Sequence, residues 1–438
     1  MRAITSGKLF KGTFVAVASA SLFATAAMAS TIGTPLTPEI TVANNIPLPY
    51  SGYTSVAHDA NGNFVVAWYV PQPYVGNQVI TFRRFAADGT PLGNAVQVAG
   101  SSVEGTPALA MDADGDFVIA WRDFGDSSGD YHIYAQVFSP DGIAVGAPVL
   151  VAQLNASITR FLDSSFNTVA AAMNTFGDFV VAWDSEVSLG GANDVVGRWT
   201  IQLRRFHLNG APYSAAAVVE QKTSLLSYHY VSNVHLSMND AGNFATVWGE
   251  RGGPFKVRYY AADATPTSSA AVLPVQPLEN KNDTYNTFAT ALENNGELLL
   301  AYTIQVYQTG IIVQPQTVYL QRYSGATPDG QVVTVAARQL AASGEAGDLA
   351  ITALPSGGGA VVWSDDASAI NGVTGSISAE VFSAANSSIG AFSVGSYPQD
   401  LPQAGAGIGI AGLSVTTDAS GNLWAVWNAV KARLFSAF

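Results

Sequence analysis

A cluster of ring-bearing side chains has the clearest potential for chemistry in this 438-residue chain. Tyr228, His229 and Tyr230 are consecutive, and His235 follows closely. Such rings stack on sugars, and their polar atoms form hydrogen bonds. With an arginine nearby to neutralise a uronic acid, His or Tyr can also take the proton in a β-elimination. We predict that these four residues bind a ligand, and that His235, Tyr228 and Tyr230 are catalytic if the protein is an enzyme.

The acidic turn that contains Asp112, Asp114 and Asp116 resembles part of a calcium-binding loop. A complete EF-hand loop also needs a late glutamate and flanking helices, which this segment lacks. The matching turn at Asp59 has fewer carboxylates, and pairs of Asp or Asn with Gly are common in hairpins. The pattern favours a structural turn over a calcium site, so we expect no metal and no cofactor. The sequence also lacks cysteine, HExxH, GxSxG and a glycine-rich phosphate loop, whereas a Ser-His-Asp triad stays open.

The acidic turn at Asp112 belongs to a motif that occurs seven times and is typified by AMDADGDFVIAW, from Ala110 to Trp121. Each copy ends in an aromatic anchor, with a glycine six residues before it. The copies recur every 53 to 65 residues, and a repeat of this length with several strands is typical of propeller blades. The anchors are Trp68, Trp121, Trp183, Trp248, Tyr302, Trp363 and Trp427.

Each repeat is expected to form four antiparallel strands, a to d. In the second repeat we predict them at 108–112, 117–121, 133–138 and 148–152. Strand b is apolar on both faces, and stacking between neighbouring blades would cover both. Pairs such as Asp88-Gly89 favour a tight turn between strands c and d. The sequence therefore predicts an all-β, seven-bladed β-propeller of four-stranded antiparallel blades.

The N-terminal segment contains an unpaired copy of strand d. Residues 33–36 and 40–43 match residues 89–92 and 96–99 of the first repeat in type and spacing. The last repeat reaches Phe438 after its strand c. We therefore predict that the N-terminal strand completes the last blade and closes the ring, in a single domain over residues 30–438.

Residues 1–29 have the pattern of a signal peptide. A basic start is followed by an apolar run and by Ala27-Met28-Ala29, a small-x-small cleavage pattern. We expect cleavage near Ala29 and a secreted, periplasmic or cell-surface protein without a membrane span. Cleavage would remove Arg2, Lys8 and Lys11 and change the net charge from −13 to −16. Such an acidic chain repels phosphate backbones, so we expect no nucleic-acid partner.

The repeats resemble those of bacterial secreted β-propeller proteins, whose copies read much like DADGDFVVAW followed by an aromatic, Asp-Gly and a small-residue strand. The resemblance covers nearly all of the chain after residue 29. It implies the propeller fold, and little about activity, because most of those proteins are uncharacterised.

The longest connections, those between strands b and c and between strands d and a, are expected on one face of the propeller. Long loops on a rigid scaffold are where binding sites usually lie.

His235 occupies a position where the other six repeats have Ser or Ala, and it either marks the site or fills space in the core. His58 replaces Met or Leu, so we expect it to fill the core. We predict a binding or adhesion scaffold for an extracellular glycan or protein; the alternative is a carbohydrate-active enzyme, most plausibly a polysaccharide lyase, using the long-loop face.

Overall fold

The computed structural model describes residues 31–43, 54–70, 79–98, 103–124, 131–154, 169–188, 196–225, 231–250, 254–275, 284–308, 311–338, 349–365, 375–397, 412–427 and 431–437. The proposed signal peptide lies outside these residues. The described residues form β-strands and no helix. In this part of the chain no segment is a helix long and apolar enough to cross a membrane.

The strands form seven sheets of four antiparallel strands each. The first four blades contain β2 (Thr54–His58), β3 (Phe64–Val70), β4 (Val79–Phe85) and β5 (Val96–Gln97); β6 (Val103–Met111), β7 (Phe117–Phe124), β8 (Tyr131–Phe138) and β9 (Ala144–Leu154); β10 (Val169–Met173), β11 (Phe179–Ser188), β12 (Val196–Phe206) and β13 (Ala217–Leu225); and β14 (Val231–Met238), β15 (Phe244–Glu250), β16 (Phe255–Tyr260) and β17 (Ala271–Val272).

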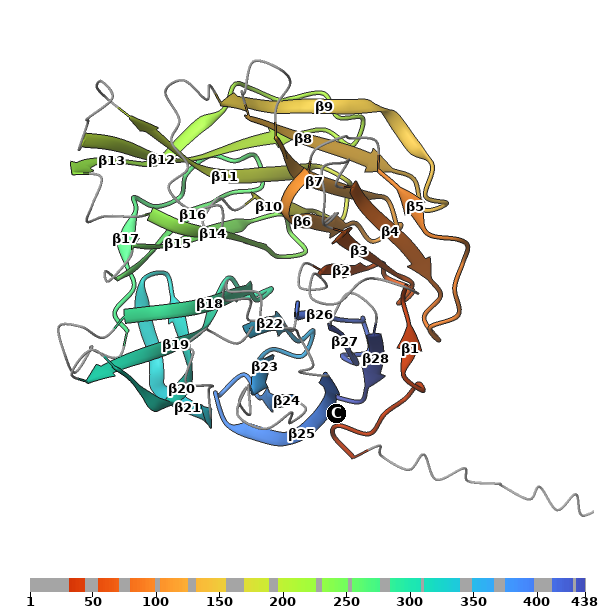
Figure 1. The fold of residues 1–438 in the computed structure, drawn as a ribbon, viewed down its shortest axis with the longest axis vertical. Helices are drawn as coiled ribbons and strands as arrows, with labels where there is room; N and C mark the ends of the chain where they lie inside the picture. Colours follow the sequence, from red (N-terminus) through yellow and green to blue (C-terminus); the bar gives the residue numbers. More distant parts are fainter. Residues whose placement is uncertain are drawn as a thin grey trace, which may run out of the picture.

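The last three blades contain β18 (Thr284–Leu292), β19 (Leu298–Gln308), β20 (Ile311–Ser324) and β21 (Thr327–Arg338); β22 (Leu349–Ala353), β23 (Gly359–Asp365), β24 (Gly375–Phe382) and β25 (Ser388–Tyr397); and β26 (Ser414–Thr417), β27 (Leu423–Trp427), β28 (Lys431–Phe435) and β1 (Ile40–Thr41). The sheets are arranged around a central axis, with the first strand of each repeat innermost (Figure 1). The chain is a seven-bladed β-propeller, as the repeats predict.

The last blade is closed by the N-terminal segment. Strand β1 pairs with β28, and Ile40 lies opposite Ala432. The Gly33 N–H donates to the Ser436 carbonyl at 2.7 Å, and the Ser436 N–H donates to Thr34 at 2.9 Å. The predicted ring closure is therefore confirmed, and it covers the edge of β28.

The hydrophobic core lies between the blades. Phe64, Val66 and Trp68 of β3 pack toward the last blade, whereas Val65 and Ala67 pack toward the second. This confirms that both faces of strand b are covered. In blades one to four the aromatic that ends strand c stacks on the first residue of strand b, as Phe64 and Phe85 do with ring centroids 4.9 Å apart. Aromatic stacking therefore joins strands b and c within these four blades.

A repeated arginine also joins neighbouring blades. Arg204 donates from Nη1 to the Val151 carbonyl of the preceding blade at 3.2 Å and from Nε to Ser214 at 2.9 Å. Its guanidinium lies 5.4 Å from the centre of the Phe206 ring. Arg83 and Arg258 make the matching contacts in their own blades. Each of these arginines therefore ties strand c to the preceding blade as well as to its own strand d.

A buried ion pair within blade five also bonds to blade six. Arg322 and Glu293 are 1% and 2% exposed and form a direct salt bridge. Glu293 Oε1 also accepts the N–H of Gly358 at 2.5 Å. In the other turns the N–H of the residue after the turn glycine donates to an Asp or Asn side chain of the same turn. In blade six the residue that follows strand a is Leu354, which has no acceptor oxygen in its side chain. The glutamate of one blade thus satisfies a backbone group in the next, which a buried N–H requires.

Two of the long connections between strands b and c, which the sequence predicts as loops, form paired strands in their described parts. The segment from Thr303 to Gln316 continues β19 and β20 as an extended hairpin, with Gln308 opposite Ile311. Strand β11 likewise extends to Ser188, which pairs with Gly197. The length of these connections predicts loops, but pairing with the neighbouring strand satisfies their backbone groups as extended strands.

Candidate functional site

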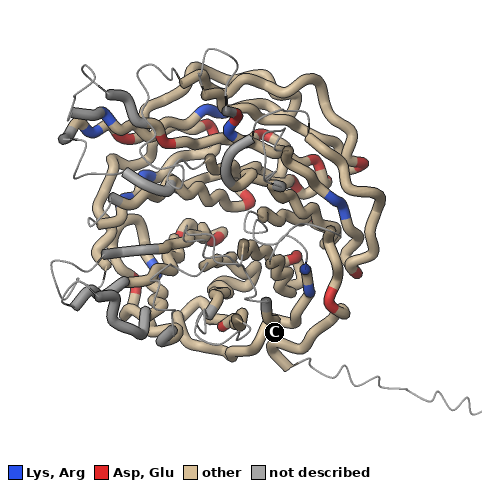
Figure 2. The backbone as a smooth tube through the Cα atoms, in the orientation of Figure 1, with Lys and Arg blue, Asp and Glu red and all other residues tan. Residues whose placement is uncertain are grey.

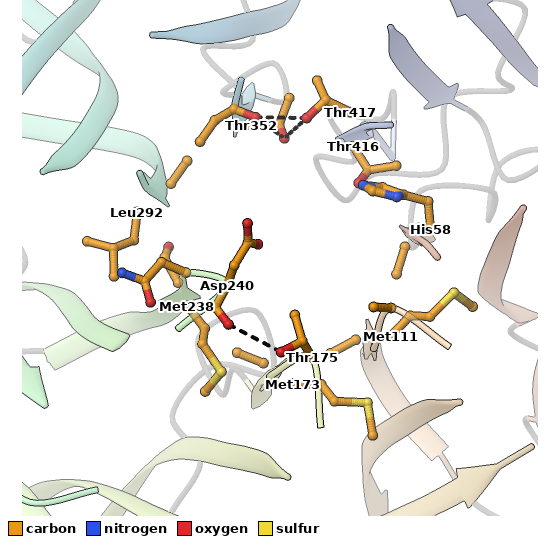
Figure 3. A pocket seen from close by; sticks show the side chains of 18 of the residues that line it. His58, Met111, Met173, Thr175, Met238, Asp240, Leu292, Thr352, Thr416 and Thr417 are labelled. Carbon is orange, nitrogen blue, oxygen red and sulfur yellow. Dashed lines mark hydrogen bonds between the residues drawn. The ribbon is translucent and has the colours of Figure 1, made fainter. Parts of the chain in front are cut away.

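A cavity of about 580 Å³ lies on the propeller axis, at the end where strand a turns into strand b. All seven blades contribute to its wall, with side chains arranged in a ring (Figure 3). The last residue of each inner strand forms one layer of this wall: His58, Met111, Met173, Met238, Leu292, Ala353 and Thr417. The volume is within the range of about 300 to 1,000 Å³ that is usual for small-molecule sites.

The turns that surround the cavity are fixed by an Asp or Asn that follows strand a. Asp59 Oδ1 accepts the N–H groups of Asn61 and Asn63 at 2.8 and 2.9 Å. Asp112 binds Asp114 and Asp116 in the same way. The turn glycine follows with a positive φ, 80° at Gly62 and 95° at Gly115. This geometry explains why the motif requires glycine six residues before the anchor.

The acidic turn that suggested calcium therefore uses Asp112 as a backbone acceptor. Burial, together with the neighbouring Asp116 carboxylate, raises the pKa of Asp112 to about 6. Among the residues that the structure describes, no group of three or more His, Asp or Glu side chains is placed to hold a metal ion. The turn's hydrogen bonds account for the Asx-Gly pattern without a metal.

Three polar side chains at the cavity mouth form a connected chain across blades three to five. The Thr175 hydroxyl donates to the Asp240 carbonyl at 3.3 Å. Asn294 donates from Nδ2 to Asp240 Oδ2 at 2.7 Å, and its Oδ1 accepts the Asp240 N–H at 3.1 Å. The Asp240 side chain extends into the open centre of the ring in Figure 3. Adjacent turns thus fix one another on this side of the mouth.

The cavity has an acidic lining. Asp59, Asp112, Asp240 and Asp418 contribute to it, and none of the described residues that line it is Lys or Arg. Figure 2 shows acidic positions near the centre of the ring and basic positions farther out. A negatively charged ligand would meet like charges here, which disfavours its binding.

The residues predicted to bind a ligand are only partly placed. Tyr228, His229 and Tyr230 lie outside the described residues. His235 is on β14 and packs against Phe288 of the next blade, with ring centroids 4.3 Å apart. Burial lowers the pKa of His235 to about 4, so the imidazole is neutral at neutral pH. It is not among the residues that line the axial cavity, and its role in binding or catalysis stays a prediction.

His58 lines the cavity, whereas the sequence suggested that it fills the core. Its Nδ1 donates to the Asp59 carbonyl at 2.8 Å, and the side chain is only partly buried. This position borders both the cavity and the space between blades, because Met111, Met173 and Leu292 at the same position also pack against the core clusters. The seven-residue ring could have been identified by reading one column of the aligned repeats, but propensity arguments alone do not separate the axis from the core.

No family model matches this chain, and no curated protein matches it. Its fold is similar to that of solved β-propellers. A polysaccharide lyase, Uly1, is 10% identical over 90% of this chain and 91% of its own, with a TM-score of 0.48. The WD40 domain of Doa1 is 11% identical over 92% and 98%, with a TM-score of 0.42. An α-L-arabinanase from Penicillium chrysogenum is 12% identical over 75% and 92%, with a TM-score of 0.41. A likeness at this level concerns the fold alone.

Proposed function

We propose that this protein is a secreted glycan-binding module whose ligand enters the axial cavity between the a–b turns. The observation that carries the proposal is the cavity itself, which all seven blades build and which combines hydroxyl, amide, carboxylate and apolar groups. A concave site of this size suits a sugar unit, whereas protein partners usually bind over broad and flatter surfaces. The rigid ring needs no rearrangement to present it.

Binding is favoured over catalysis by the roles that most ionisable groups of the wall already have. The carboxylates of Asp59 and Asp418 each accept two backbone N–H groups of their own turns. His58 donates to a backbone carbonyl. A general acid or base needs a free proton-transfer position facing the substrate, and these groups are engaged in holding the turns. Asp240 keeps an open carboxylate oxygen, but the described lining has no Lys or Arg to neutralise the acid group of a uronate during β-elimination. The lyase alternative instead depends on Tyr228, Tyr230 and His235, which the sequence assigns to the long-loop face.

The test is a screen of the purified chain on immobilised glycans, followed by titration calorimetry with each positive glycan. The same glycans are incubated with the protein and analysed for the unsaturated sugar that β-elimination produces. We expect saturable binding and recovery of intact glycan. Failure to bind any glycan would refute the proposal, and accumulation of unsaturated product that depends on His235 would replace it with the lyase.

A further inference from the structure

The mouth of the axial cavity is asymmetric although the ring that carries it is repetitive. One position per blade, eight residues before the aromatic anchor, lines the mouth. On blades three to five this position is polar, with Thr175, Asp240 and Asn294. On the other four blades it is Ala60, Ala113, Pro355 and Ala419. Because every blade forms the same kind of turn, the turn itself does not require this division into a polar arc and an apolar arc.

The polar arc retains hydrogen-bonding capacity toward the cavity. A carboxylate can accept about four hydrogen bonds, and a side-chain amide can donate two. Within the described part of the chain, Asp240 Oδ2 accepts one bond from Asn294, which uses one N–H of that amide. Asp240 Oδ1 and the second Asn294 N–H are thus suited to the adjacent hydroxyl groups of a sugar. Both residues are exposed at the mouth.

An exposed aromatic residue follows the polar arc's Thr175 in the chain, next to the residues that line the cavity and outside that set. Phe176 follows Thr175 at the tip of the blade-three turn and is 83% exposed. The matching residues of the other turns are Asn61, Asp114, Ala241, Asn295, Ser356 and Ser420. A solvent-exposed phenylalanine where the other turns have polar or small residues loses burial energy, so folding does not explain it. An aromatic ring next to hydroxyl-binding groups is suited to stack on the C–H face of a sugar.

Charge restricts the class of sugar. The lining contains aspartates and neither Lys nor Arg among its described residues, and the whole chain has a formal net charge of −13. A uronate or a sulfated sugar would enter without a cationic partner, and would face Asp240 at the mouth. An uncharged sugar can instead donate its hydroxyl protons to that carboxylate.

We propose that the mouth of the axial cavity is a subsite for an uncharged sugar ring. The polar arc receives its hydroxyl groups, the alanine and proline arc contacts its C–H groups, and Phe176 stacks on its exposed part. This inference rests on the proposed glycan-binding function and adds the position, the contacting residues and the charge of the ligand.

The test uses sugar pairs that differ only in charge: the methyl glycosides of glucose, galactose and mannose, and the corresponding uronates. Binding to the full mature chain is measured by saturation-transfer NMR and calorimetry. We expect at least one neutral glycoside to bind, and its uronate to bind roughly tenfold more weakly because like charges repel. Phe176→Ala and Asp240→Ala should each weaken the neutral sugar roughly fivefold or more.

Asn61→Ala and Asp141→Ala are matched controls, since they make the same kinds of change at a turn tip of blade one and at an outer turn of blade two. Both should bind like the parent protein. Equal or tighter binding of the uronate, no binding of any neutral glycoside, or parent-like affinity in Phe176→Ala and Asp240→Ala would each overturn the inference. The glycan screen still tests the broader function in that case, because a glycan bound elsewhere supports the module and refutes only this subsite.

Discussion

At the scale of single residues, Asp112 shows how the turns around the cavity are held and what this costs. Its side chain is buried and accepts the N–H groups of Asp114 and Asp116 at 3.0 and 2.9 Å. Blades three and four use Asn174 and Asn239 at the same position, which provide the same acceptor oxygen without a charge. The hydrogen bonds therefore require an oxygen, and the charge at Asp112 adds a desolvation cost.

Asp112→Asn is therefore expected to stabilise the fold at neutral pH. The pKa of Asp112 is raised to about 6 in the folded state, from 3.8. Between about pH 4 and about pH 6 the native state therefore holds a proton that the unfolded state has released. Stability consequently falls as pH rises from about 4 to about 6, and the cost is complete above that window. The variant should gain on the order of 1 kcal/mol at about pH 8, because solvent near the turn screens part of the effect.

Thermal unfolding at about pH 8 and about pH 4 measures this difference, which should vanish at the lower pH. Asp88→Asn is the control. The N–H and hydroxyl of Thr90 hold the pKa of Asp88 below its ordinary value, so the Asp88 charge favours folding and its removal should not stabilise the protein. A gain for Asp112→Asn that is equal at both pH values would contradict this explanation.

At the scale of elements, one short strand completes the ring. Strand β1 contributes only Ile40 and Thr41 to the ladder, yet Val42 beside it is fully buried between the last blade and the first. Leu36 donates to the Leu434 carbonyl at 2.8 Å, and the Thr37 hydroxyl accepts the Leu434 N–H at 3.1 Å. The N-terminal segment thus supplies both hydrogen bonds and core contacts that no other strand replaces.

Removal of residues 30–44 should lower the melting temperature by roughly 10 °C or more, because it exposes the edge of β28 and the core beneath Val42. Differential scanning calorimetry and size-exclusion chromatography would detect the loss of stability and the association of exposed edges. A truncated chain that melts and elutes like the protein starting at residue 30 would show that closure through β1 does not stabilise the ring.

These elements were predictable to different degrees. The periodic anchors, the glycines with positive φ and the displaced strand d specify the propeller, because each reflects a local requirement of backbone or packing. The ends of β19 and β20 were not predictable, because pairing there depends on a partner strand more than on an apolar pattern. His235 illustrates a similar limit: its replacement of a small residue is visible in the repeats, but its packing against Phe288 depends on the neighbouring blade.

At the scale of the whole molecule, the same repetition that builds the ring also builds the cavity. Seven similar turns meet at the axis. Three of them have a polar residue where the other four have Ala or Pro, and these residues, Thr175, Asp240 and Asn294, make one side of the mouth polar. Loop length predicts a site on the long-loop face instead, because long loops often carry binding sites. The signal for the axial site is instead a difference among aligned repeats, and it is readable from the sequence once the blades are superimposed.

Occlusion of the cavity tests the central claim most directly. Ala60 is exposed on the apolar arc of the mouth. Ala60→Trp therefore adds bulk at the entrance without placing the larger side chain among the buried core residues. Ala385→Trp makes the same change at an exposed outer turn of blade six. With unchanged melting temperatures, calorimetric titration of a glycan that binds the parent protein should give at least roughly tenfold weaker binding for Ala60→Trp, and parent-like binding for Ala385→Trp. Parent-like binding by Ala60→Trp, with a loss of binding on replacement of Tyr228 and Tyr230 by alanine, would contradict the account and favour the long-loop site predicted from the sequence.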